Sequence, residues 1–191
     1  MPLQPRYAII RTMQIYFVKH GKTPSASEMR LSEDDEGLSD KGIAEAKAAA
    51  QALKARLNGT NLAKIISSPR KRTYETANII ANAFGIDVKD VEYDKRLIER
   101  DCGPYTGQLI ADVFSKSEKE LTEGGMEPLQ NLYERSERFY NEIKTKDVTG
   151  CILLVGHSGN LAPLIFAAKG AHLGDAIVVP DLSLDDVLRL N

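Results

Sequence analysis

The sequence predicts an α/β protein, a three-layer α/β/α sandwich with a mainly parallel central sheet, and three observations support that class. Short apolar, β-branched runs alternate with longer segments whose apolar residues recur every three or four positions, the pattern of successive βα units. The chain has 191 residues, of which 42% are hydrophobic, enough for one domain with a buried core. Two apolar runs, residues 15–18 and 151–155, lead within two residues into histidines. We therefore expect a single domain over residues 1–191.

The N-terminal half starts the alternation of strands and helices. Residues 15–18 predict a buried strand. Apolar residues at steps of three and four predict a helix that Ser39 caps and Gly59 follows. Residues 63–66 predict the next strand, and the amphipathic segment after them predicts a helix that stops at Gly85.

The C-terminal half continues the same alternation. Its predicted elements are a strand at 91–93, helices at 108–117 and 128–144, a strand at 151–156, a helix from 159 and a strand at 176–179. Right-handed crossovers between such strands produce a mostly parallel sheet with helices on both faces.

Two polar segments are expected outside this framework. Residues 1–12 precede the first strand and contain two prolines, so we expect a loose N-terminal extension. Residues 25–37, SASEMRLSEDDEG, are polar and acidic. They predict a solvated loop at the border of a site.

Composition excludes several classes of protein. The 25 basic and 27 acidic residues are well mixed and give a net charge of −2, which argues against nucleic-acid or membrane partners bound through a bulk field. The two cysteines, Cys102 and Cys151, do not suggest a disulfide framework. The opening residues contain no seven-residue apolar region or small-residue cleavage site, and no run of about 18 apolar residues occurs in the sequence, so neither a leader nor a membrane span is expected. We expect a soluble cytoplasmic protein, and the oligomeric state is left open.

Common phosphate and metal motifs are missing. The segment GLSDKGIA has the glycines of a P-loop, but Ile43 and Ala44 replace the Lys and Ser/Thr that contact phosphate and magnesium. Neither cysteine has an arginine six positions later, so a cysteine-phosphatase loop is excluded. His20 and His157 lack His or Cys neighbours at ligand spacing, so no metal site and no cofactor are expected.

Two of the three histidines end apolar strands. His20 follows IYFVK and His157 follows ILLVG. In a parallel sheet both would emerge at the same carboxyl edge and could meet there. One histidine in such a place is usually structural, but two, each followed by glycine within two residues, favour a function.

Four segments carry a resemblance to a known family. VKHGKT resembles the R-H-G-x-T signature of the histidine phosphatase (phosphoglycerate mutase-like) superfamily, with lysine for the first arginine. SSPRKRTYETA, LIERDCGPYTG and VGHSG resemble its later blocks, in the same order. The resemblance extends from Met13 to about Lys169 and implies a mainly parallel sheet between helix layers.

The chemistry of phosphoryl transfer fits these residues. Transfer needs an in-line nucleophile, donors around three equatorial oxygens, and a proton for the leaving oxygen. A neutral imidazole at His20 can attack phosphorus, and nearby Lys19 and Arg72 would lower its pKa. Gly21 allows close backbone approach and would place a carbonyl or amide beside the ring, fixing which nitrogen is free.

The resemblance implies that Arg72, Lys19 and His157 clamp the phosphoryl group. Guanidinium binds two oxygens, whereas the ammonium of Lys19 is a point charge. Lys19 is therefore expected to attract phosphate without orienting it, which keeps a non-catalytic relative as an alternative. Arg70 and Lys71 are expected to be solvated surface charges.

Glu99 is the candidate general acid because the family spacing falls on it, with Asp101 as its competitor. Thr23 could donate a hydrogen bond to phosphate or serve as a local cap. Tyr105 could line the pocket, although a half-buried loop aromatic is the simpler interpretation. His172 lies in a loop-like segment without an expected role.

The sequence favours hydrolysis of a phosphomonoester through a phosphohistidine on His20. The partners would be a small phosphorylated substrate and inorganic phosphate as product. Ala26 and the acidic segment replace the asparagine and G-W motif usual in mutases, and an open site lets water attack the intermediate. Glu99 suits esters with poor leaving groups. A phosphoglycerate mutase-like isomerase stays as an alternative, and residues 25–37 and 103–125 reveal no specificity code.

Overall fold

A computed structural model of the chain describes residues 13–176 and 187–191. This part contains a five-stranded sheet in the order β3-β2-β4-β1-β5. The first four strands in that order run parallel, and the last pairs antiparallel with its neighbour. The strands are β1 (Gln14–Lys19), β2 (Leu62–Ser67), β3 (Glu92–Tyr93), β4 (Cys151–Gly156) and β5 (Leu188–Arg189). The predicted fold class is confirmed, whereas the predicted extension at 1–12 and most of the strand at 176–179 lie outside the described residues.

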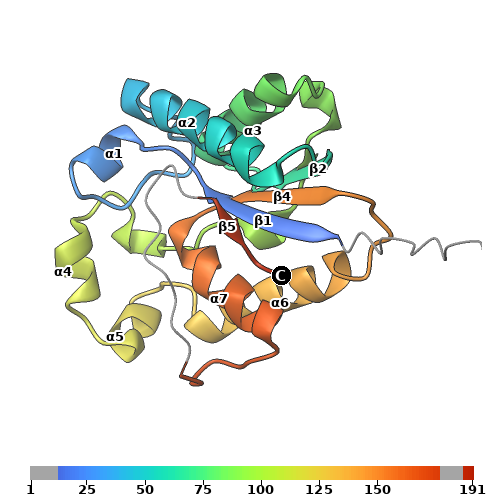
Figure 1. The fold of residues 1–191 in the computed structure, drawn as a ribbon. Coiled ribbons are helices and arrows are strands. Elements are labelled where there is room, and N and C mark those ends of the chain that lie inside the picture. Colours follow the sequence, from blue (N-terminus) through green and yellow to red (C-terminus); the bar gives the residue numbers. More distant parts are fainter. Residues whose placement is uncertain (1–12, 177–186) are drawn as a thin grey trace, which may run out of the picture.

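Two pairs of helices cover the two faces of the sheet (Figure 1). One face packs on α2 (Asp40–Leu57) and α3 (Lys71–Phe84), and the other on α6 (Leu129–Ile143) and α7 (Ser158–Lys169). Strand β1 contributes side chains to both faces. Tyr16 and Val18 join the apolar cluster beneath α2 and α3, and Ile15 and Phe17 join the one beneath α6 and α7. This alternation follows from the two-residue period of a strand.

Helix ends explain where the long helices start and stop. Ser39 Oγ accepts a hydrogen bond from the backbone N of Gly42, as its position predicted. Helix α2 ends at Leu57, and the residue after it, Asn58, adopts the left-handed conformation with φ of 43°. Asn58 therefore takes the capping position that the sequence suggested for Gly59. Gly85, with φ of 69°, ends α3 as predicted.

Three short helices, α1 (Pro24–Ser27), α4 (Ile110–Phe114) and α5 (Glu118–Glu123), lie beyond one end of the sheet (Figure 1). The 3-10 turns are η1 (Val88–Asp90), which precedes β3, and η2 (Lys95–Leu97) and η3 (Gly103–Tyr105), which follow it. The helix predicted at 108–117 is shorter than expected. A capping box between Ser117 and Glu120 starts a new helix at the position where the prediction ended.

Two further observations concern the described part of the chain. Cys102 and Cys151 are free there, as the sequence predicted. None of the helices in residues 13–176 and 187–191 combines the length and apolarity that crossing a membrane requires.

Candidate active site

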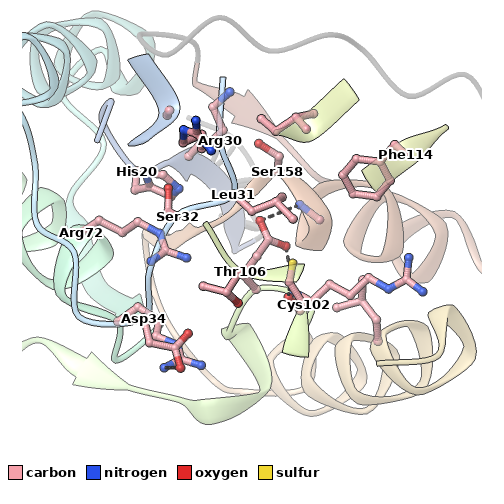
Figure 2. A pocket seen from close by; sticks show the side chains of 18 of the residues that line it. His20, Arg30, Leu31, Ser32, Asp34, Arg72, Cys102, Thr106, Phe114 and Ser158 are labelled. Atoms are coloured by element: carbon pink, nitrogen blue, oxygen red, sulfur yellow. Dashed lines mark hydrogen bonds and ion pairs between the residues drawn. The ribbon is translucent and has the colours of Figure 1, made fainter. Parts of the chain in front are cut away.

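A cavity of about 600 Å³ opens at the carboxyl edge of the sheet. Lys19 ends β1 and His20 follows it, Arg72 lies in the first turn of α3, and Glu99 follows η2. All four predicted residues line this one cavity, and Figure 2 shows His20 and Arg72 on the same side of it. Segments far apart in the sequence thus converge, because β1, β2 and β3 belong to one parallel set and end at the same edge.

The backbone around His20 fixes the orientation of its ring. Its backbone N donates to the carbonyl of Gly156 at 3.0 Å, and its Nδ1 lies 2.8 Å from the carbonyl oxygen of Gly21. A carbonyl can only accept, so Nδ1 carries the proton and Nε2 is the bare nitrogen of the neutral ring. Gly21 is itself held by Thr76 Oγ1 at 3.1 Å. A Cβ on Gly21 would collide with the carbonyl oxygen of Gly42, so only glycine fits.

The environment of His20 favours its neutral form. Desolvation is the largest cause, and the positive charges of Arg72 and Lys19 add to it, so the pKa falls from 6.5 to about 3. The hydrogen bond to Gly21 opposes this shift. The two cations act in the predicted direction, but the sequence did not reveal that burial is the larger effect.

His157 lies against His20 but deeper in the protein. The two ring centroids are 5.1 Å apart in an edge-on arrangement. The side chain of His157 is fully buried behind the cavity lining, and its Nε2 lies 2.9 Å from Ser68 Oγ. Burial, followed by the charges of His20 and Arg72, holds the pKa of His157 well below 6.5. The sequence did not single out Ser68, although it is the second serine of the SSP segment before α3.

Arg72 is a buried cation at the start of α3. Only 3% of its surface is exposed, and its Nη1 donates to the carbonyl of Glu33 at 2.9 Å. Burial lowers the pKa of its guanidinium, while the carboxylate of Glu99 opposes that shift. A guanidinium with so little contact with water gains strongly from any anion that enters the cavity.

Arg70 corrects one expectation. It was expected to be a solvated surface charge, but it lines the cavity and forms an ion pair with Asp34 at 2.5 Å. Asp34 belongs to the acidic segment, which therefore folds against the cationic side of the site (Figure 2). Lys71 is exposed, as expected.

Three buried nitrogens of this cluster have no hydrogen-bond partner within residues 13–176 and 187–191. They are Arg70 Nε, Arg72 Nε and His157 Nδ1. Buried polar atoms in folded proteins are nearly always paired. The two arginine nitrogens can only donate, and unpaired donors on neighbouring cationic groups are suited to an anionic ligand.

Glu99 lies against the start of α7. Its Oε1 accepts a hydrogen bond from the backbone N of Arg100 at 2.9 Å, and its Oε2 accepts one from the backbone N of Gly159 at 3.3 Å. A Cβ on Gly159 would collide with Oε1, so glycine is required for this approach. Desolvation raises the pKa of Glu99 above 4.5 despite these hydrogen bonds. Its competitor Asp101 is exposed and accepts from Gly103 N at 2.8 Å instead.

Arg135 on α6 holds the backbone that carries Glu99. Its Nη1 donates to the carbonyls of Arg96 at 2.7 Å and Ile98 at 2.6 Å, and its Nη2 to the carbonyl of Glu99 at 3.1 Å. Glu127 pairs with Arg135 through both carboxylate oxygens at 2.9 Å. Sequence reasoning missed Arg135, because it lies on α6 between apolar positions and no motif marks it.

The remaining candidates lie away from the cavity. Thr23 is buried, and its Oγ1 caps α1 through Ala26 N at 3.2 Å and lies 2.9 Å from Ser32 Oγ. Its predicted bond to phosphate stays a prediction. Tyr105 is half-buried in a small apolar cluster, as the simpler interpretation had it. His172 lies in an exposed turn.

The fold and the site define a class of protein: an α/β protein with two neighbouring histidines, a buried arginine and a carboxyl group gathered at the carboxyl edge of its sheet. A family model for the histidine phosphatase superfamily (branch 1) matches residues 15–184. The chain belongs to that superfamily. Membership of this superfamily supports phosphatase or mutase activity for the chain.

Named relatives include both kinds of enzyme. Phosphoserine phosphatase 1 of Hydrogenobacter thermophilus is 31% identical over 73% of this chain and 67% of its own length. The probable phosphoglycerate mutase GpmB of Salmonella choleraesuis is 32% identical over 64% of this chain and 59% of its own length. The chain thus spans three fifths to two thirds of these relatives.

Solved structures share the fold. YhfR of Bacillus stearothermophilus superposes with a TM-score of 0.75 at 24% identity, covering 93% of this chain and 90% of its own. A mycobacterial glucosyl-3-phosphoglycerate phosphatase complexed with VO3 has a TM-score of 0.67 at 25% identity, covering 81% of each chain.

Proposed function

We propose that this protein hydrolyses phosphomonoesters through a phosphohistidine intermediate on His20. The observation that carries the proposal is the state of the His20 ring. The hydrogen bond from Nδ1 to Gly21 and the pKa of about 3 leave Nε2 with a free electron pair at ordinary pH.

In the first step Nε2 of His20 attacks phosphorus, and an N–P bond forms as the P–O bond to the alcohol breaks. Glu99 gives its proton to the leaving oxygen, a role that its raised pKa supports. In the second step water attacks phosphorus, a P–O bond forms as the N–P bond to His20 breaks, and the Glu99 carboxylate takes the proton from water. Inorganic phosphate leaves, and both residues return to their starting states.

Arg72 and Lys19 would hold the phosphoryl oxygens through the transfer. Both line the cavity beside His20, and the unpaired Nε of Arg72 supports an anion between them. We assign His157 to the same clamp. Its contact with His20 and its nearness to the buried cations support that role.

The test is to trap the intermediate. The protein is mixed with 4-nitrophenyl phosphate and quenched rapidly, and mass spectrometry of the digested chain locates the phosphate. We expect a phosphoramidate on His20 that survives base and is lost in acid. His20→Ala should remove it and lower kcat by about 10⁴-fold or more. His172→Ala, which changes the exposed histidine, is the matched control.

Two other outcomes separate the alternatives. Interconversion of 3-phosphoglycerate without net release of inorganic phosphate would identify a mutase. Binding of inorganic phosphate with no turnover of any ester would identify a non-catalytic relative. Full turnover by His20→Ala would refute the proposed mechanism.

A further inference from the structure

The cavity has an apolar wall opposite its cationic end. Side chains from four separate segments form it: Leu31, Ile110, Phe114, Leu129, Leu132 and Pro163. Figure 2 shows Phe114 on the far side of the cavity from His20 and Arg72. A volume of about 600 Å³ is large for a phosphate group alone and falls in the range of pockets that enclose organic ligands.

Two arginines of the cavity lining have partners within the protein. Arg30 donates from Nη1 to the carbonyl of Gly107 at 3.0 Å, and its Nε lies 3.5 Å from Glu28. Arg100 binds the carboxylate of Glu118 at 2.6 Å and the carbonyl of Glu127, also at 2.6 Å. The buried guanidinium of Arg100 is therefore held by the protein, whereas that of Arg30 is partly exposed.

The thiol of Cys102 adds no charge to this part of the cavity. Desolvation raises its pKa to about 11, so it stays neutral at ordinary pH. Phe114 leaves 52% of its surface exposed, apolar area that a ligand could cover. The wall therefore favours carbon over a second anionic group. The lysines of the cavity lining, Lys19 and Lys22, belong to the segment that carries His20.

We propose that this wall binds the alcohol half of the substrate, and that the substrate is a phosphomonoester of an apolar alkyl or aryl alcohol without a carboxylate. The inference rests on the proposed function, because it assigns the phosphate to the end with His20 and Arg72. Carboxylated esters would leave their second charge against apolar side chains, where desolvation is unfavourable.

A series of n-alkyl phosphates tests the wall separately from the chemistry. Alkyl chains from ethyl to hexyl have leaving groups of nearly equal reactivity, so changes in kcat/KM report contacts with the carbon chain. We expect kcat/KM for phosphate release to rise about two- to fourfold for each added methylene. Phosphoserine and 3-phosphoglycerate should be hydrolysed about tenfold or more slowly than hexyl phosphate.

A pair of variants on helix α4 locates the effect. Phe114 lines the cavity, whereas Leu109, at the start of the same helix, is similarly exposed but does not line it. Phe114→Asp should lower kcat/KM for hexyl phosphate by about tenfold and leave ethyl phosphate within about twofold. Leu109→Asp adds the same charge nearby and should leave both rates unchanged.

The outcomes distinguish this inference from the proposed function. Equal kcat/KM for ethyl and hexyl phosphate, or faster hydrolysis of the carboxylated esters, would overturn the inference while hydrolysis itself stands. An equal loss in both helix variants would also overturn it. Failure to hydrolyse every ester would overturn the proposed function and this inference together.

Discussion

The two ends of the cavity are built from different kinds of structure. The cationic end lies on the sheet edge, where the backbone of His20 bonds to Gly156 of the neighbouring strand and His157 is fully buried. The apolar wall comes from the acidic segment, the five-residue helix α4 and faces of α6 and α7. The first end has fixed geometry suited to chemistry, and the second presents adaptable apolar surface suited to selection.

This difference predicts two patterns of mutational effect. Changes at the sheet edge should lower kcat for every ester, because they act on the transition state that all esters share. Changes in the wall should act on kcat/KM for long-chain esters alone. Variants at each end of the cavity test whether a residue acts on the phosphate or on the carbon chain.

The largest effect after that of His20 is expected for Glu99→Gln. An amide cannot give a proton, so kcat for alkyl phosphates should fall by about 10²- to 10⁴-fold. The initial burst of nitrophenolate from 4-nitrophenyl phosphate should fall much less, because nitrophenolate leaves without a proton and the burst precedes the attack of water. The matched control is Asp101→Asn, at the competing carboxylate, which should change neither rate. Equal losses in both variants would contradict the assignment of Glu99.

The pH profile follows from the same pair of groups. His20 is neutral above about pH 3, so the acid limb of kcat/KM lies at low pH. In the proposed mechanism Glu99 acts while protonated, so we expect the rate for alkyl phosphates to fall as pH rises through its pKa, which is raised above 4.5. Glu99→Gln should remove this alkaline limb, which initial rates over the pH range will test.

The next largest effect on kcat is expected for Arg72→Lys. Lysine keeps the charge but loses the planar donors, so kcat should fall by about 10²- to 10³-fold for short and long esters alike. Arg70→Lys is the control, because Arg70 is already paired with Asp34, and its effect should be under about tenfold. A loss in Arg72→Lys limited to long-chain esters would move Arg72 from the phosphate end to the wall.

The same contrast explains what the sequence could predict. The apolar run at 151–156 correctly predicted a buried strand, because every residue of β4 is buried in the structure. Because parallel strands end at one edge, His20 and His157 could be expected to meet. The positions of Arg72 and Glu99 came from the resemblance, since spacing alone does not indicate which way a loop side chain points.

The parts that the sequence did not reveal depend on contacts between distant segments. Helices α1 and α5 have four and six residues, too few for a period of 3.6 to be recognised. The pairing of Arg70 with Asp34 joins two loops. The bonds of Arg135 to residues 96, 98 and 99 go to backbone carbonyls. Backbone acceptors leave no trace in residue identity, so no pattern identifies them in advance.

Arg135→Lys tests whether a residue outside the cavity positions Glu99. Lysine cannot reach the carbonyls of residues 96, 98 and 99 together, so kcat for alkyl phosphates should fall about tenfold with KM little changed. The alkaline limb of the pH profile should shift as well, which a merely structural role would not produce at constant thermal stability. Arg138→Lys, an exposed arginine on the same helix, is the control.

Lys19→Arg should have the smallest effect and the opposite sign. Lys19 ends β1 beside His20, and arginine there would add a second donor to the phosphoryl oxygens. We expect kcat to rise by up to about tenfold, by the same factor for ethyl and hexyl phosphate, because the change lies at the phosphate end. Lys22→Arg, at the other lysine of the cavity lining, should leave kcat unchanged. A gain confined to hexyl phosphate would mean that the two ends are not separable, since a phosphate contact would then be sensing the carbon chain.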